Sequence, residues 1–168
     1  MTFGLDTRSL SWKPLDDARI ARRVDEVLVS WADTPYMPGQ QSKQQGVDCI
    51  RFVCAAFDEL FGMSTPIPRL PPDTALHCPE KAVEVVRLVR EIYAPNTLIT
   101  DGTIEPGDVI VTRSGNSGPG HALIAGGREN TVWHASRHRV KQTGIGLMRR
   151  LQNLHSIIRI PNKRRWLP

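Results

Sequence analysis

The fold is decided by residues 46–62, which read GVDCIRFVCAAFDELFG. Apolar residues recur in this stretch at spacings of three and four positions, which predicts an amphipathic helix. The apolar set is Ile50, Val53, Ala56, Phe57 and Leu60. The helix begins near Cys49, and Gly62 stands where a helix end favours a residue with positive φ. The Cys49 thiol is therefore expected in the first turn of a helix.

Two further helices are predicted, one on each side of this stretch. Asp16 and Asp17 are residue types that cap helices, and apolar positions follow them at helical spacing. Those positions are Ile20, Val24, Val27, Leu28 and Trp31. Pro79 is expected to open a third helix, whose apolar residues are Val83, Val86, Val89 and Ile92. The stretches 33–47 and 66–72 contain Pro or Gly and are expected to be loops.

After residue 102 the pattern changes to short runs rich in β-branched residues, separated by Gly-rich or polar turns. This pattern is typical of an antiparallel meander. The expected strands are 109–112, 122–125, 132–135, 140–142 and 157–160. No internal repeat or linker divides the chain, so residues 1–168 are expected to form a single α+β domain. Its amino-terminal helices would pack on a carboxy-terminal antiparallel sheet.

Composition excludes several classes of protein. The chain has 168 residues, of which 40% are apolar and 23% charged, so fibrous and wholly disordered classes fit poorly. It has no apolar run long enough to span a membrane and no secretory leader, which predicts synthesis in the cytosol and no membrane partner. Cys49, Cys54 and Cys78 form no C-x-x-C pair and no zinc-type spacing. Free thiols are expected, with no metal and no cofactor.

The positive charge is concentrated in the last quarter of the chain. The net charge is +5, yet residues 128–168 hold ten of the 22 Lys and Arg residues and one of the 17 acids, Glu129. Two interpretations stay open: a surface for an anionic partner or a partner protein, and solvated strand faces with a basic tail. A nucleic-acid partner is disfavoured, because the sequence lacks a zinc knuckle, an aromatic-basic stripe and a P-loop lysine.

Cys49 is the candidate nucleophile. The N–H groups and the dipole at a helix start favour a thiolate, so its pKa is expected below the usual value of about 8.5. His121 is the candidate base, and a four-residue turn at 126–129 would place it opposite His134. Thiol acyl transfer uses a nucleophilic cysteine, a base that accepts its proton and a third group that orients the base. The alternative is an inert cysteine with two structural histidines, and this is the only interpretation for His77, His138 and His155.

An ordered set of motifs resembles the NlpC/p60 family of papain-like cell-wall cysteine peptidases over residues 31–136. The motifs are Pro35-Tyr36, Gly46-Val47-Asp48-Cys49, Phe61-Gly62, Glu105-Pro106-Gly107-Asp108-Val109, Gly120-His121-Ala122 and Trp133-His134-Ala135. The resemblance implies Cys49 as nucleophile, His121 as general base and His134 as third catalytic residue. It implies that Tyr36 and Asp48 line a pocket that holds a peptidoglycan stem peptide by its free amine. The alternative interpretation is that Tyr36 is an aromatic residue packed in the loop and Asp48 is the cap of the helix that begins at Cys49. The implied reaction hydrolyses the γ-D-glutamyl bond to diaminopimelate or lysine through an acyl-enzyme.

The sequence departs from the family's pattern beside the nucleophile. The family continues Asp-Cys with Ser-Gly, whereas this chain has Ile50-Arg51, so its substrate preference is open. Arg51 either pairs with a substrate carboxylate or blocks the pocket. Without a leader or wall-binding modules, this chain resembles the family members encoded with phage tails and gene transfer agents. That resemblance implies that the protein is part of the virion and is delivered to the wall by a tail tip. The basic segment 137–168 would then be a docking surface. Two rivals are a non-catalytic tail-assembly component of the same fold, and a thiol acyltransferase or amidase acting on a lipid or small amide.

Overall fold

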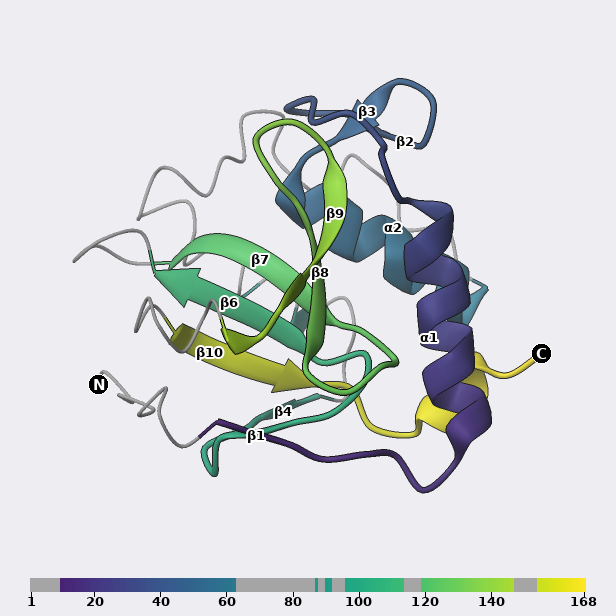
Figure 1. The fold of residues 1–168 in the computed structure, drawn as a ribbon, viewed down its shortest axis with the longest axis vertical. Coiled ribbons are helices and arrows are strands. Elements are labelled where there is room, and N and C mark those ends of the chain that lie inside the picture. Colours follow the sequence, from purple (N-terminus) through teal and green to yellow (C-terminus); the bar gives the residue numbers. More distant parts are fainter. Residues whose placement is uncertain (1–9, 63–86, 88–89, 92–95, 114–118, 147–153) are drawn as a thin grey trace.

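The computed structural model describes residues 10–62, 87, 90–91, 96–113, 119–146 and 154–168. Two helices, α1 (Ala18–Ser30) and α2 (Cys49–Phe61), lie together beside a six-stranded sheet (Figure 1). This arrangement confirms the predicted α+β class. Within these ranges no helix has both the length and the hydropathy that crossing a lipid bilayer requires.

Local signals place both helices where the sequence predicts them. Asp17 caps α1 by accepting from the Arg19 N–H. Asp48 caps α2 by accepting from the Arg51 N–H at 2.9 Å, and Gly62 ends α2 at a φ of 64°. Eleven of the 13 residues of α2 are buried, because the helix lies between α1, the sheet and the carboxy-terminal 3-10 turn η3 (Lys163–Trp166). The nucleophile candidate therefore begins the central helix of the core.

The six-stranded sheet is antiparallel and has the order β4-β10-β6-β7-β8-β9. Its strands are β4 (Thr97–Leu98), β6 (Val109–Arg113), β7 (Pro119–Ala125), β8 (Thr131–Ala135), β9 (Val140–Gly144) and β10 (Leu154–Arg159). The predicted meander is confirmed for β6 to β9. The last strand departs from it, because β10 crosses back to lie between β4 and β6. A strand pattern identifies a segment but not its partner across the sheet.

Two short strand pairs complete the described elements. β1 (Ser11–Trp12) runs parallel to β5 (Thr103–Ile104), and β2 (Gln41–Ser42) pairs with β3 (Gly46–Val47). The second pair lies inside 33–47, which the sequence predicts as a loop without regular structure. The predicted helix after Pro79 falls mostly outside the described residues, although Arg87, Arg90 and Glu91 are helical. The predicted loop 66–72 also lies outside them.

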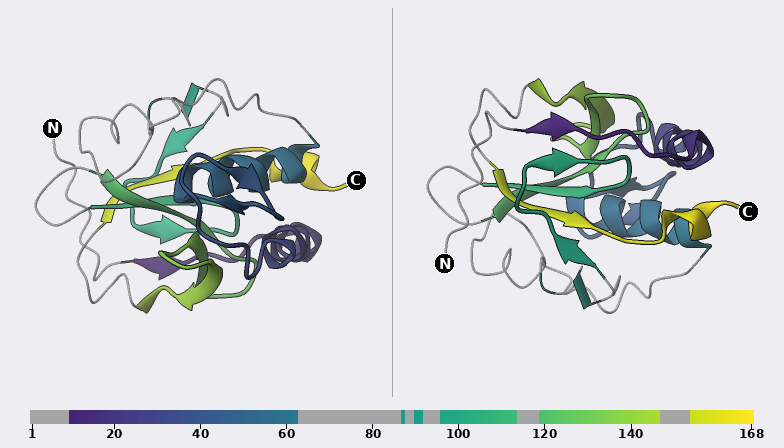
Figure 2. Two further views of the ribbon diagram at one scale, coloured as in Figure 1. Left: turned by 90° about the horizontal axis from the view of Figure 1, so that it is seen from above. Right: turned by 90° about the horizontal axis from the view of Figure 1, so that it is seen from below.

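Each face of the sheet packs into its own hydrophobic cluster. One cluster joins both helices and Trp166 to sheet residues that include Val111, Ala122 and Ile124. The cluster on the other face includes Ile110, Leu123 and Val132, together with Leu10. Figure 2 shows α1 and α2 side by side at one end of the molecule, with η3 beside them. Residues that alternate along β7 therefore face different clusters.

A tight turn at residues 105–108 connects the sheet to the carboxy-terminal segment. Pro106 follows Glu105, Gly107 has a φ of 82°, and the Asp108 N–H donates to the Glu105 carbonyl at 3.0 Å. These are features of a type II turn, which favours glycine at its third position. A Cβ at Gly107 would lie 2.5 Å from the Trp166 ring. The Pro-Gly pair thus lets η3 pack directly on the turn.

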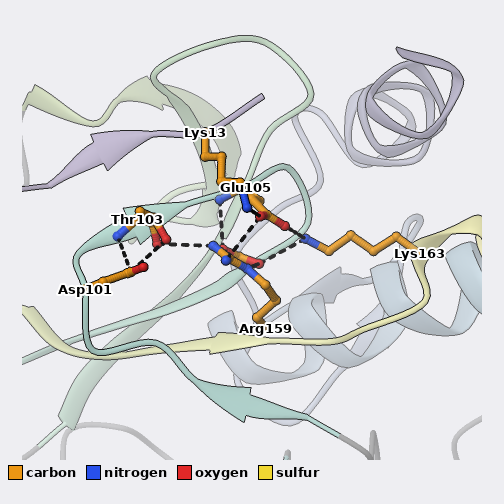
Figure 3. Close-up of polar contacts among 7 residues, drawn as sticks. Lys13, Asp101, Thr103, Glu105, Arg159 and Lys163 are labelled. Atoms are coloured by element: carbon orange, nitrogen blue, oxygen red, sulfur yellow. Dashed lines mark hydrogen bonds and ion pairs between the residues drawn. The ribbon is translucent and has the colours of Figure 1, made fainter. Parts of the chain in front are cut away.

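The same turn supplies the acids of a buried charge network, which we define as Glu105, Asp108, Arg159 and Lys163. The Asp108 carboxylate is fully buried and accepts from Arg159 at 2.7 Å and from the Lys163 ammonium at 3.0 Å. Glu105 pairs with both cations, and Lys13 reaches it from the surface at 3.1 Å (Figure 3). The network fastens β10 and η3 to the start of β6.

Candidate active site

Cys49 lies where strands β7 and β8 part. In the described residues, the ladder between them consists of the pairs Ile124–Trp133 and Ala125–Val132. This register directs the Ala122 N–H toward β8, and that N–H donates to the Cys49 sulfur. The thiol thus stands where a ladder carbonyl would otherwise lie, with 7% of the residue exposed. The predicted position in the first turn of a helix is confirmed.

The imidazoles of His121 and His134 are in direct contact. Nε2 of His121 lies 2.8 Å from Nδ1 of His134, and the two rings meet edge to face with centroids 5.0 Å apart. His121 directly precedes Ala122, so β7 presents this pair beside the residue that binds the thiol. The structure therefore joins the two histidines to which the resemblance assigns catalysis, and it places Cys49 beside the residue that follows His121.

The strand register differs from the predicted one. The predicted turn at 126–129 is wrong by one residue, because the observed pairing of 125 with 132 places the four-residue turn at 127–130. His134 is consequently aligned with residue 123 rather than with His121. The histidines still meet because this shift moves the partner by two positions, which leaves both side chains on one face of the sheet as diagonal neighbours.

The contact between the rings constrains where their protons lie. A hydrogen bond needs one donor and one acceptor, and each neutral imidazole carries one N–H. When His121 donates from Nε2 to Nδ1 of His134, Nδ1 of His121 is unprotonated and able to accept a proton. His134 then keeps its proton on Nε2, a buried atom with no hydrogen-bond partner in the described structure. This arrangement suits His121 as a base and His134 as the residue that orients it.

Burial controls the protonation of Cys49. The lowered pKa expected from its place at a helix start is wrong for this structure, because burial raises the pKa of the thiol to about 12. The N–H groups of Ala122, Ile50 and Cys49 favour the thiolate, but they do not offset burial, and the Asp48 carboxylate opposes them. The resting thiol is therefore protonated at neutral pH, and a base is needed to form the nucleophile.

Burial likewise keeps His134 neutral. It lowers the pKa of this imidazole to about 4, and the nearby positive charge of Lys141 contributes in the same direction. A neutral His134 retains one unprotonated ring nitrogen, which is what the hydrogen bond from His121 requires.

We expect His134 to make the fold less stable in mild acid. Its pKa falls from 6.5 to about 4 on folding, so between these values the folded protein binds fewer protons than the unfolded chain. The free energy of unfolding must then decrease as the pH falls through this window. Urea denaturation at about pH 7 and about pH 5 should show a smaller acid-induced loss for His134→Asn than for wild type. The exposed His138→Asn is the control, and equal losses in wild type and His134→Asn would contradict the expectation.

Tyr36 reaches the start of α2 from the loop 33–47. The backbone around it pairs with β3, where the Met37 N–H donates to the Val47 carbonyl at 3.1 Å. Gly46 has a φ of 129°, and a Cβ there would lie 2.5 Å from the Met37 Cβ. Glycine is thus required both for the backbone conformation and for the close approach. The Gly46-Val47-Asp48-Cys49 motif holds Tyr36 beside the helix start.

The Tyr36 hydroxyl is protonated at neutral pH. Burial raises its pKa, and the negative charges of Asp48 and of an ionised Cys49 act in the same direction. These influences place the three side chains in one neighbourhood. Tyr36 is therefore a hydrogen-bond donor next to the thiol.

Asp48 and Arg51, both expected at the substrate pocket, contact each other. Oδ2 of Asp48 accepts from Nη1 of Arg51 at 2.7 Å and from the Gly39 N–H at 2.9 Å. Oδ1 accepts from the Arg51 N–H, which makes Asp48 the cap of α2. The side chains are 7% and 1% exposed. The sequence left two roles open for Arg51, and in this structure its guanidinium is directed at Asp48.

Two contributors to this site are backbone groups, which the sequence analysis did not identify. The Ala122 N–H binds the sulfur, and the Gly39 N–H binds Asp48. Every residue except proline carries such an N–H, so its use depends on where the chain passes. The only sequence signal for the Ala122 N–H was the Gly120-His121-Ala122 motif, and the Gly39 N–H had no sequence signal.

No protein-family model and no curated protein sequence matches the chain, whereas solved structures do. The crystal structure of the NlpC/p60 domain of the peptidoglycan hydrolase SagA matches with a TM-score of 0.54 and 17% identity, covering 82% of this chain and 97% of that one. A lipoprotein-like NLP/P60 protein from Staphylococcus aureus subsp. aureus Mu50 matches with a TM-score of 0.58 and 16% identity. There the match covers 88% of this chain and 43% of that one. The motifs and these likenesses agree, and the chain has the NlpC/p60 fold.

Proposed function

We propose that the protein is a cysteine peptidase that hydrolyses peptidoglycan stem peptides at the γ-D-glutamyl bond to diaminopimelate or lysine. The observation that carries the proposal is the Cys49 thiol at the start of α2, bound to the residue that follows His121, with His121 in contact with His134. The fold is shared with the NlpC/p60 domain of a peptidoglycan hydrolase, and this supports the choice of substrate.

In the proposed reaction, His121 Nδ1 takes the thiol proton as the Cys49 sulfur attacks the scissile carbonyl carbon. The new C–S bond makes a tetrahedral oxyanion, whose collapse breaks the C–N bond while His121 returns the proton to the leaving amine. Water then attacks the thioester and gives a proton to His121. The second tetrahedral intermediate collapses with cleavage of the C–S bond, the carboxylic acid leaves, and His121 returns the proton to the sulfur.

The helix start supplies donors for the oxyanion. Asp48 already engages the N–H groups of Arg51, through its side chain, and of Phe52, through its carbonyl. The N–H groups of Cys49 and Ile50 are directed at the thiol instead. They are placed to donate to an oxygen that develops charge beside the sulfur. The protonated Tyr36 hydroxyl is a further donor for a substrate carbonyl.

Mass spectrometry of purified muropeptides incubated with wild type and with Cys49→Ala tests this proposal. We expect new fragments with wild type alone, because only the thiol can form the acyl-enzyme. Fragment masses identify the bond that is cut. Cys54→Ala is the matched control, because Cys54 is a buried cysteine in the same helix and is expected to be dispensable for cleavage.

Two outcomes would overturn it. Folded wild type that cuts no muropeptide, with a Cys49 that does not react with iodoacetamide, would favour the non-catalytic tail-assembly component. Cleavage confined to lipid or small amide substrates would favour the acyltransferase or amidase. Delivery to the wall by a phage-type tail, with segment 137–168 as the docking surface, stays a prediction from the sequence.

A further inference from the structure

The Asp48 carboxylate already accepts from three donors of its own chain. One oxygen accepts from the Arg51 N–H at 2.9 Å, and the other accepts from the Arg51 guanidinium at 2.7 Å and the Gly39 N–H at 2.9 Å. Both side chains of the pair are more than nine-tenths buried. The carboxylate thus has a cation and two backbone donors before any substrate arrives.

The helix itself gains little from a cation at this position. Arg51 is the third residue of α2 and lies at the positive end of the helix dipole, where a cation is unfavourable. Burying a guanidinium is also costly unless it is paired at close range. The ion pair with Asp48 offsets both costs. The position of Arg51 is therefore explained by charge neutralisation of Asp48.

This neutralised pair belongs to the wall of the candidate active site. Asp48 directly precedes Cys49, and its charge acts on both the Cys49 thiol and the Tyr36 hydroxyl. A group of the substrate that binds near the thiol and Tyr36 therefore meets a carboxylate that is already paired with a cation.

We propose that Arg51 is a built-in counterion that replaces a substrate ammonium at Asp48, so that the protein takes stem peptides whose amino end is acylated and uncharged. This inference rests on the proposed function and specifies its substrate class. The resemblance implies that Asp48 helps to bind a free substrate amine, and our inference reverses this preference. An acylated amino end is the state of a stem peptide that is still joined to its glycan through an amide.

The physical reason is competition for one carboxylate. A substrate ammonium would have to compete with the guanidinium for Asp48 and so break a buried ion pair, or it would itself be desolvated beside a carboxylate that is already paired. An amide at the same place carries no charge and incurs neither penalty. The wall therefore discriminates against the amine rather than attracting it.

The first test needs no variant of Arg51. Two stem peptides that differ only in a free or an N-acetylated amino end are compared by kcat/KM with wild type, and by Kd with Cys49→Ala using calorimetry. We expect the acetylated peptide to be used and bound at least as well as the free one. A preference of about tenfold or more for the free amine would overturn the inference while leaving the peptidase intact. If wild type cuts neither peptide, the proposed function fails, and the ratio of the two Kd values then decides the inference. If neither peptide binds, the inference is overturned as well.

The second test removes the counterion. Arg51→Ala uncovers the carboxylate and is expected to shift the ratio of free-amine to acetylated kcat/KM, or of the corresponding affinities, by about tenfold toward the free amine. Arg51→Lys is the matched control, because it retains a cation and should keep the wild-type ratio. Adding Asp48→Asn to Arg51→Ala should cancel the shift. An unchanged ratio in an Arg51→Ala protein with a native circular dichroism spectrum would refute the inference, and if this variant does not fold, the wild-type comparison decides alone.

Discussion

Replacing His121 with alanine is expected to lower kcat/KM for stem-peptide hydrolysis by about a thousandfold or more. Burial holds the pKa of the Cys49 thiol at about 12, so almost no thiolate forms at neutral pH unless a base removes the proton during attack. His121 is the imidazole that β7 presents next to the residue binding the sulfur. Steady-state kinetics on a purified muropeptide, with circular dichroism to verify folding, would measure the loss.

Two further histidine variants make this result specific. His134→Ala is expected to cost less than His121→Ala, because His134 orients the base rather than accepting the proton. His138→Ala, at an exposed position, should retain the wild-type rate. Comparable rates for wild type and His121→Ala would show that another group accepts the thiol proton.

Replacing Asp108 with asparagine is expected to lower the free energy of unfolding by about 3–5 kcal/mol. The substitution keeps the shape of the side chain but removes the charge that Arg159 and Lys163 share. Asp108 is fully buried, so water has little access to the place that the lost charge leaves beside these cations. Glu105 alone would then face both of them. Urea denaturation monitored by tryptophan fluorescence measures the change.

Asp101→Asn is the matched control for this substitution. Asp101 is exposed and accepts from the N–H and the hydroxyl of Thr103 at 2.9 and 2.7 Å, which an amide oxygen can also do (Figure 3). Only a small change in stability is expected there. Similar losses for the two variants would mean that the buried charge network adds nothing beyond an ordinary surface cap.

The fold was largely predictable because its elements carry local signals. The caps Asp17 and Asp48, the terminating Gly62 and the period of the apolar residues each act within a few residues. The partner of β10 depends instead on contacts between residues far apart in the chain, to which a strand pattern is blind. The contact between His121 and His134 was predicted with the wrong register. It survived because an error of two positions does not change the face of a strand.

The electrostatics of the site were harder to predict than its residues. Placing Cys49 at a helix start accounts for favourable N–H groups, but the balance with burial depends on how much structure covers the thiol, and this is a tertiary property. The role of Arg51 posed the same difficulty. Its spacing of three from Asp48 allows contact within a helix turn, yet only the fold shows that both side chains are buried together.

The separation of charge along the chain is partly offset in three dimensions. Basic residues of the last quarter find acids contributed by earlier segments: Arg159 and Lys163 meet Glu105 and Asp108, and Arg139 meets Asp33. At these positions the excess of positive charge seen in the sequence is therefore offset by neighbouring acids. An anion approaching from solution would experience a weaker and patchier attraction than the linear sequence implies, since several of these positive charges are already matched at short range.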